Sequence, residues 1–132
     1  MKNPSATALL EAFVNEHPEY RGYPEPPAGH FGASEEVADS CVRLVMRGLK
    51  RSTSHSLLGL QHRGESLPGI GDLNIVTDWA GNAHCIIRTL KVRLKPFFSV
   101  SPEDARLEGE GDGSLEYWKQ AHWDYYTLEL GA

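Results

Sequence analysis

The clearest structural signal in this sequence is a pair of apolar segments separated by a short turn. Residues 73–79 (LNIVTDW) and 84–94 (HCIIRTLKVRL) flank Ala80-Gly81-Asn82. Such a pair predicts a β-hairpin, because turn residues that tolerate positive φ reverse the chain between two strands. Residues 90–95 alternate apolar and basic side chains, which would place the basic ones on one face of a strand. The fold must therefore accommodate antiparallel sheet.

Helix signals surround this hairpin. Residues 5–17 combine a capping serine, an apolar stripe and a proline stop, and residues 35–47 follow Ser34 with two acids in the first turn. Serine also precedes the predicted helices that begin at Pro102 and Leu115. Further strands are predicted at 56–60 (SLLGL) and 127–130 (TLEL). This order indicates an α+β fold, with five or so short strands in a small curled sheet or barrel surrounded by helices.

The length of 132 residues suits one domain. We expect residues 1–30 to form an N-terminal helix and a Pro-rich arm packed on the body, with the main domain over 31–132. No apolar run approaches the ~18 residues of a membrane span. The two cysteines, Cys41 and Cys85, cannot make a disulfide framework, so a cytoplasmic location and no membrane partner are expected.

The formal net charge of −5 argues against a general polyanion binder. The charges are segregated, with acids at 103–116 and bases at 43–63 and 91–95. A nucleic-acid function would therefore need a local basic cleft rather than a wholly basic face.

One candidate site is Gly48-Leu49-Lys50-Arg51-Ser52-Thr53, directly after a predicted helix end. A lysine there can bind phosphate, orient a carbonyl or act as a base, and a hydroxyl three residues later can be a nucleophile. Spacing alone favours a plainer interpretation, a helix cap followed by a basic surface turn.

A second candidate is Glu108-Gly109-Glu110-Gly111-Asp112, in which three acids alternate with glycines. Acids this close can raise one another's pKa, which suits general acid–base work, or can collect a hard cation. The alternative is a solvated turn whose acids face the N-terminus of the next helix. We assign no metal ligand and no required cofactor, and name Mn²⁺ or Mg²⁺ as ions to test.

Aromatic residues crowd the last predicted helix. Trp118, His122 and Tyr125 lie near one stripe, which usually means core. His122 is interpreted as a hydrogen-bonded structural histidine. Trp123 and Tyr126 lie off that stripe, and exposed rings there could stack on bases.

Together these motifs resemble the ASCH-domain family of the PUA-like superfamily, and in particular its long bacterial subgroup. The matching blocks are Phe31-Gly32, Gly48-x-Lys50-x-x-Thr53, Leu67-Pro68-x-x-Gly71-Asp72, Ala105-x-x-Glu108-Gly109-Glu110-Gly111-Asp112, Ser114-Leu115-Glu116-Tyr117-Trp118 and His122. The resemblance implies a small PUA-like β-barrel with a cleft lined by the signature motif. It also implies RNA as a ligand class, since that superfamily characteristically binds RNA.

The family includes single-strand ribonucleases and amidohydrolases of N4-acetylcytidine nucleosides. By motif, the resemblance assigns catalytic roles to Lys50, Thr53 and Glu108. Candidate substrate-binding residues are Arg47, Arg51, His55, Glu110, Tyr117 and Trp118. His55 stands where the amidohydrolase branch commonly has arginine.

Three functions stay open at this stage. The favoured one is hydrolysis of single-stranded RNA by a Lys/Glu cleft. The alternatives are deacetylation of an N4-acetylcytidine-type nucleoside and non-catalytic binding of RNA or a nucleotide. The expected partner is single-stranded RNA or a modified nucleoside, and both a monomer and a homodimer remain open.

Overall fold

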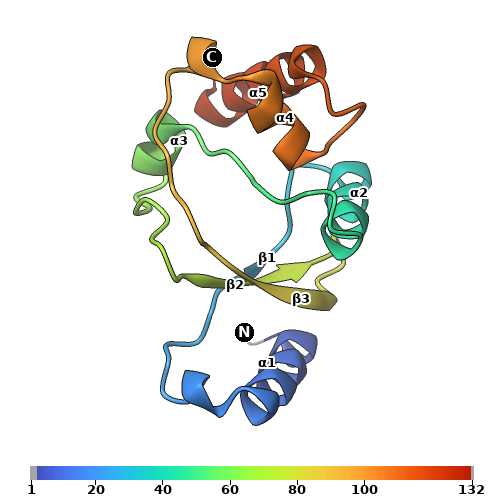
Figure 1. The fold of residues 1–132 in the computed structure, drawn as a ribbon, viewed down its shortest axis with the longest axis vertical. Helices are drawn as coiled ribbons and strands as arrows, with labels where there is room; N and C mark the ends of the chain where they lie inside the picture. Colours follow the sequence, from blue (N-terminus) through green and yellow to red (C-terminus); the bar gives the residue numbers. More distant parts are fainter. Residues whose placement is uncertain (1–2, 132) are drawn as a thin grey trace. The chain divides into compact units, whose positions relative to one another are not determined.

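The computed structural model of the chain describes residues 3–131 and has a mixed α+β fold (Figure 1). In the described residues the helices are α1 (Pro4–Glu16), α2 (Glu35–Met46), α3 (Leu57–His62), α4 (Pro102–Glu108) and α5 (Leu115–Leu130). Short 3-10 turns cover Pro18–Tyr20 and Phe97–Ser99. The strands are β1 (Ala28–Gly29), β2 (Leu73–Thr77) and β3 (Ala83–Arg88).

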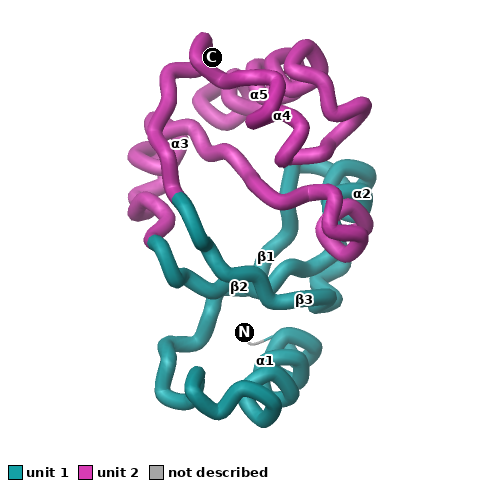
Figure 2. The backbone as a smooth tube through the Cα atoms, viewed as in Figure 1, with its two compact units in different colours: residues 1–42, 70–91 teal, residues 43–69, 92–132 magenta. Residues whose placement is uncertain are grey.

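Contacts within the chain divide it into two compact units (Figure 2). The first unit comprises residues 1–42 and 70–91, and the second comprises 43–69 and 92–132. The boundary we predict between residues 30 and 31 remains a prediction.

The first unit holds a sheet in the order β1-β2-β3. β1 runs parallel to β2, and β2 pairs antiparallel with β3 through registers such as Ile75↔Ile86. The predicted hairpin is therefore confirmed at its centre. Its second strand ends at Arg88, so the alternating residues 90–95 are not a strand, contrary to our expectation.

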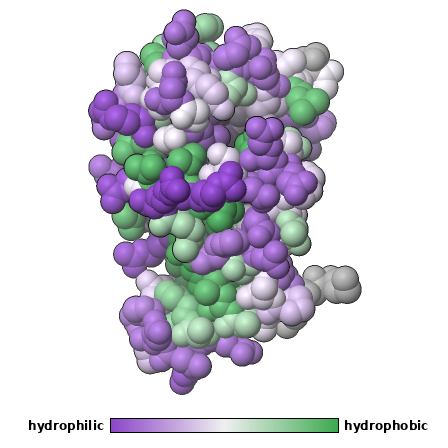
Figure 3. Space-filling model, turned by 90° about the vertical axis from the view of Figure 1, so that its right-hand side faces the viewer, coloured by the Kyte–Doolittle hydropathy of each residue, from purple (hydrophilic) through white to green (hydrophobic). Residues whose placement is uncertain are grey.

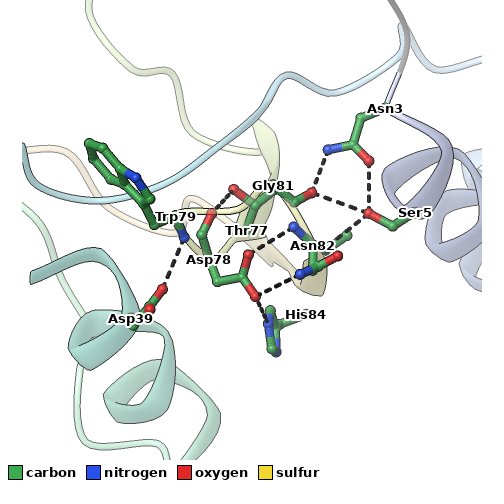
Figure 4. A network of polar contacts seen from close by, with 10 residues as sticks. Asn3, Ser5, Asp39, Thr77, Asp78, Trp79, Gly81, Asn82 and His84 are labelled. Atoms are coloured by element: carbon green, nitrogen blue, oxygen red, sulfur yellow. Dashed lines mark hydrogen bonds and ion pairs between the residues drawn. The ribbon is translucent and has the colours of Figure 1, made fainter. Parts of the chain in front are cut away.

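The hairpin turn carries a polar network that fastens α1 to the sheet (Figure 4). Asn3 caps α1 and donates its Nδ2–H to Gly81 O at 2.6 Å, while Ser5 Oγ accepts from Ala83 N at 3.0 Å. Asp78 accepts from Asn82 N at 2.9 Å and contacts His84 at 3.1 Å. The helix cap is thus Asn3 rather than Ser5, which instead bonds across to the turn.

In the second unit two predicted strands prove to be helical. Residues 57–60 belong to α3, because Ser56 caps a helical turn by accepting from Gly59 N at 3.2 Å. Residues 127–130 continue α5, which ends only at the left-handed Gly131. The structure therefore does not confirm a barrel of five to six strands; the described residues contain a three-stranded sheet.

The predicted starts of α4 and α5 are confirmed in detail. Ser101 and Asp104 form a reciprocal capping box, and Ser114 accepts from Tyr117 N at 3.1 Å. α4 and α5 pack against each other within this unit (Figure 1).

Apolar side chains form the buried core and also reach the surface. The buried set is Ala6, Ala38, Cys41, Val42, Leu60, Ile75, Val76, Ala105 and Trp118. On the face shown in Figure 3, hydrophobic and hydrophilic residues are interleaved. None of the helices in residues 3–131 combines the length and the hydrophobicity needed to cross a bilayer.

Candidate functional site

The second unit brings the lysine motif and the acidic glycine loop together. Arg51 N and Ser52 N both donate to Leu107 O, at 2.7 and 3.1 Å. Leu107 lies in the last turn of α4, where carbonyls have no partner within the helix. This pairing sets the segment that carries Lys50 against the residue that precedes Glu108.

Gly109 permits this close approach. It caps α4 in the left-handed conformation, with φ of 68°, and a Cβ there would stand 2.5 Å from Leu49 O. Only glycine avoids both the conformational cost and the collision. The glycine of the acidic loop is therefore needed for the site to assemble.

Lys50 lies at the centre of the site, with its side chain only 2% exposed. Its Nζ donates to Ser52 O and to Glu110 Oε2, both at 2.9 Å, and lies 3.8 Å from Glu108 Oε1. A buried ammonium is costly unless carboxylates and hydrogen bonds compensate for its lost hydration, and here both are present.

Glu108 is equally buried, with 3% of its side chain exposed. Its Oε2 accepts from Ser54 Oγ and from Trp118 Nε1, the latter at 2.7 Å. Burial raises the pKa of Glu108, but the polar contact with His122, the hydrogen bonds from Ser54 and Trp118 and the charge of Lys50 outweigh it. The pKa of Glu108 therefore lies below its ordinary value, and the group is a carboxylate at neutral pH.

The other oxygen of Glu108 is less well satisfied. Among the described residues, Oε1 is buried without a well-directed hydrogen bond. Its polar neighbours include His122 Nε2 at 3.2 Å and Lys50 Nζ at 3.8 Å. His122 stacks on Trp118, with ring centroids 4.2 Å apart, and its Nδ1 lies 2.8 Å from Trp118 O.

The remaining acids of the loop diverge. Glu110 faces Lys50, whereas Asp112 turns back and accepts from Ser114 N at 2.9 Å. Its hydrogen bonds with the Ser114 side chain and backbone lower the pKa of Asp112. Glu108 and Glu110 therefore belong to the site, and Asp112 does not.

Ligand-type atoms of Glu108, Glu110 and His122 lie within 4.8 Å of one another. The ammonium of Lys50 faces both carboxylates, at 2.9 Å from Glu110 Oε2 and 3.8 Å from Glu108 Oε1, and already supplies them with a positive charge. The cluster is therefore organised around the lysine, and we assign none of its members as a metal ligand.

The predicted residues divide into those that meet and those that do not. Lys50, Glu108, Glu110 and Trp118 are brought together. Arg47, Arg51, Thr53, His55 and Tyr117 are exposed, although Arg51 joins the site through its backbone and the Tyr117 ring covers Gly111. Desolvation, followed by Arg63, lowers the pKa of His55.

Sequence reasoning missed Ser54 and undervalued His122. The hydroxyl at Glu108 belongs to Ser54, next to the predicted Thr53. His122 follows Trp118 by four residues, one helical turn, so its position beside that ring was available from the sequence.

Comparison with known proteins identifies the family to which this fold belongs. The family model for the ASCH domain matches residues 27–132. The chain belongs to the ASCH domain family. The ASCH domain of Lactobacillus crispatus JV V101 has a similar crystal structure, with a TM-score of 0.89 and 32% identity, covering 96% of this chain and 80% of that one.

A second similar structure is protein EF3133 from Enterococcus faecalis V583, described under the family model DUF984. It is similar to this ASCH domain with a TM-score of 0.87 and 29% identity, over 97% of this chain and 76% of that one. Among curated proteins, no significant match was found.

Proposed function

We propose that this ASCH domain is a hydrolase of single-stranded RNA that works through Lys50 and Glu108. The observation that carries the proposal is the buried ion cluster in which Lys50 Nζ is held by Glu110 Oε2 at 2.9 Å and faces Glu108 Oε1 at 3.8 Å. Replacing buried ion pairs by apolar groups is often neutral or stabilising, so stability alone is a weak reason for this cluster. Chemistry is a better one.

The residues have complementary roles in phosphodiester cleavage. Lys50 would stabilise the charge that develops on the phosphorane, and Glu110, at 23% exposure, is the partner that a substrate phosphate can displace from it. Glu108 would accept the proton of the attacking ribose 2′-hydroxyl, since it is ionised and held by fixed donors, and would return that proton to the 5′ oxygen that leaves as the P–O5′ bond breaks.

Exposed arginines in the segment around Lys50 in the sequence favour a strand rather than a small molecule as substrate. Arg43, Arg47 and Arg51 are exposed in the second unit, and none has a carboxylate partner within residues 3–131. Such arginines are available to phosphates along a strand.

Aromatic rings beside the site can receive bases. A groove of about 300 Å³ is lined by Phe97, Glu116, Lys119, Gln120 and Trp123. Phe97 contacts both the buried Trp118 and the exposed Trp123, with centroids 5.4 and 5.9 Å away. Stacking on such rings is tolerant of sequence, as a nuclease of single strands requires.

A second candidate is amide hydrolysis of an N4-acetylated nucleoside. It is favoured by the neutralisation of Lys50 by two carboxylates, since a neutral substrate need not compete with them. The hydroxyl near Glu108 in that case is that of Ser54.

The test is turnover of a single-stranded RNA and, separately, of N4-acetylcytidine, each with and without Mn²⁺ or Mg²⁺. Wild type is compared with Lys50→Met and Glu108→Gln. Asp112→Asn is the matched control, because Asp112 belongs to the same loop but bonds to Ser114. Circular dichroism checks that each variant is folded.

We expect RNA cleavage to fall about 100-fold or more in the two site variants and to persist in the control. Equal cleavage by all four proteins would assign the activity to a contaminant and overturn the proposal. Deacetylation alone would select the second candidate. RNA binding without turnover would make the domain a binding module.

A further inference from the structure

We propose that His122 is a positioning residue for Glu108, holding Oε1 of that carboxylate through a proton on Nε2, as an imidazolium. The inference deepens the proposed function and rests on it in one respect, the acid–base role of Glu108. It assigns a task to a histidine that sequence patterning interprets as merely structural.

The first step is the proton on Nδ1. Nδ1 lies 2.8 Å from Trp118 O, and a carbonyl oxygen can only accept a hydrogen bond. Nδ1 must therefore carry a hydrogen. Turning the ring over would put carbon atoms at both polar contacts, so the observed orientation is the one that uses both nitrogens.

The second step concerns Nε2, which lies 3.2 Å from Glu108 Oε1. With Nδ1 protonated, a neutral ring would present a lone pair at Nε2 to the lone pairs of a carboxylate. Such a contact is repulsive in a site where Glu108 is 3% and His122 13% exposed. A proton on one of these two atoms removes the repulsion, and we place one there, although its direction toward Oε1 falls short of a well-formed hydrogen bond in the free protein.

The third step places that proton on the histidine. Oε2 of Glu108 already accepts from Ser54 and Trp118, which favours the ionised carboxylate. Lys50 faces the same group. With His122 charged, two cations and two carboxylates meet in the cluster and its formal charge is zero.

Other groups facing the pair come from every neighbouring element. The lysine segment contributes Lys50, Ser54 and His55, the loop contributes Glu110, and α5 contributes Tyr126, whose ring lies 5.7 Å from His122. Burial, followed by the charge of Glu108, raises the pKa of Tyr126, so that group stays neutral. The charge that compensates Glu108 thus comes from Lys50 and His122.

This arrangement leaves Oε1 as the oxygen available to the reaction. Its contact to His122 is close but poorly directed and its contact to Lys50 is long, and catalytic contacts of that kind commonly tighten when substrate binds. His122 keeps Oε1 aimed toward the lysine, while Ser54 and Trp118 hold Oε2.

The test needs no substrate, so it is separate from the test of turnover. Ring nitrogens of the histidines in full-length protein are labelled with ¹⁵N and recorded at pH 7 by NMR. We expect both nitrogens of His122 to show protonated signals in wild type. In Glu108→Gln, the Nε2 signal should move to the unprotonated position.

Two comparisons guard against misassignment. His122→Gln identifies the His122 signals by their loss, and Glu110→Gln, at a more exposed carboxylate that bonds Lys50, should leave Nε2 protonated. An unprotonated Nε2 in wild type at pH 7 would overturn the inference, whether or not Glu108→Gln folds.

An activity readout extends the test if RNA is cleaved. His122→Gln retains a donor toward Oε1 and should keep more activity than His122→Leu, with kcat affected rather than KM. The acid limb of the pH–activity profile of His122→Gln should move to higher pH than in wild type, because Glu108 loses a neighbouring cation. Equal activity and an unchanged pH profile in both variants would contradict the positioning role while leaving the hydrolase proposal intact.

Discussion

Gly109 lies against the backbone of Leu49 so closely that a Cβ would stand 2.5 Å from the Leu49 carbonyl oxygen. This contact joins the end of α4 to the segment that delivers Lys50. Lys50 and Glu110 are 60 positions apart in the sequence, and they meet because these two backbone segments touch.

Gly109→Ala should therefore be more damaging than an ordinary loop substitution. The left-handed conformation alone costs an alanine about 1–2 kcal/mol, and the collision with Leu49 adds to that. Gly113→Ala is the matched control, since Gly113 also has positive φ, 76°, but a Cβ there meets open space. Urea unfolding should show a clearly larger loss for Gly109→Ala, and equal losses would refute the steric argument.

Trp118→Phe should lower the stability of the domain, because the buried carboxylate of Glu108 loses a hydrogen-bond donor. The substitution keeps an aromatic ring but removes the Nε1–H that Glu108 Oε2 accepts at 2.7 Å. We expect a loss of about 1–3 kcal/mol in unfolding free energy. Trp123→Phe, on the exposed side of the same helix, should change stability by no more than about 0.5 kcal/mol. Comparable losses at both positions would mean that the hydrogen bond contributes little.

Asp104 should make the stability of the domain depend on pH in acid. Its hydrogen bond with Lys95, followed by that from Ser101 N, lowers the pKa of Asp104 from 3.8 to about 2. Because the folded pKa is depressed, the contribution is present above the unfolded pKa and is lost as pH falls from about 4 to about 2.

Asp104→Asn keeps an acceptor for Ser101 N but removes the charge, so its stability should fall less steeply over that range. Lys95→Met removes the cation that pairs with Asp104, whose Oδ2 lies 2.6 Å from Lys95 Nζ. This variant should also show a weaker dependence of stability on pH. Thermal unfolding between pH 5 and 2 measures both effects. Wild-type steepness in both variants would show that other groups control the acid transition.

Arg47 and Arg51 should contribute to RNA affinity through phosphates. Each arginine that contacts a phosphate adds about 0.7 to the slope of log K against log salt for a single strand. Arg47→Gln and Arg51→Gln should each weaken binding to a single-stranded RNA and reduce that slope. Arg106→Gln, whose native guanidinium pairs with Glu103, should retain the wild-type slope. A slope unchanged in all three variants would exclude these phosphate contacts.

Local patterns predict the elements whose signals are themselves local. The hairpin over 73–88 and the capping box at Ser101 follow from turn and cap chemistry within a few residues. The strand prediction over 56–60 is wrong, because a short apolar run fits either a strand or a helix. The cap at Ser56 was the available signal for a helix. The strand predicted at 127–130 is instead the end of α5, and the signal that stops this helix is Gly131.

The site was predictable in its residue types but not in its contacts. Motifs single out Lys50 and Glu108, yet which hydroxyl reaches Glu108 depends on backbone bonds between residue 107 and residues 51 and 52. That pairing places Ser54, rather than the expected Thr53, at the carboxylate. Nothing within either segment alone specifies this choice.

Trp118 and His122 are one helical turn apart on α5, and between them they reach both oxygens of Glu108. An α-helix advances 3.6 residues per turn, so a shift of one residue turns a helix face by about 100°. Sliding or rotating α5 would withdraw the indole and the imidazole together. The indole and imidazole contacts therefore act as one mechanical unit: a movement of this helix would remove both at once and leave Glu108 with Ser54 and Lys50 alone among the partners described above.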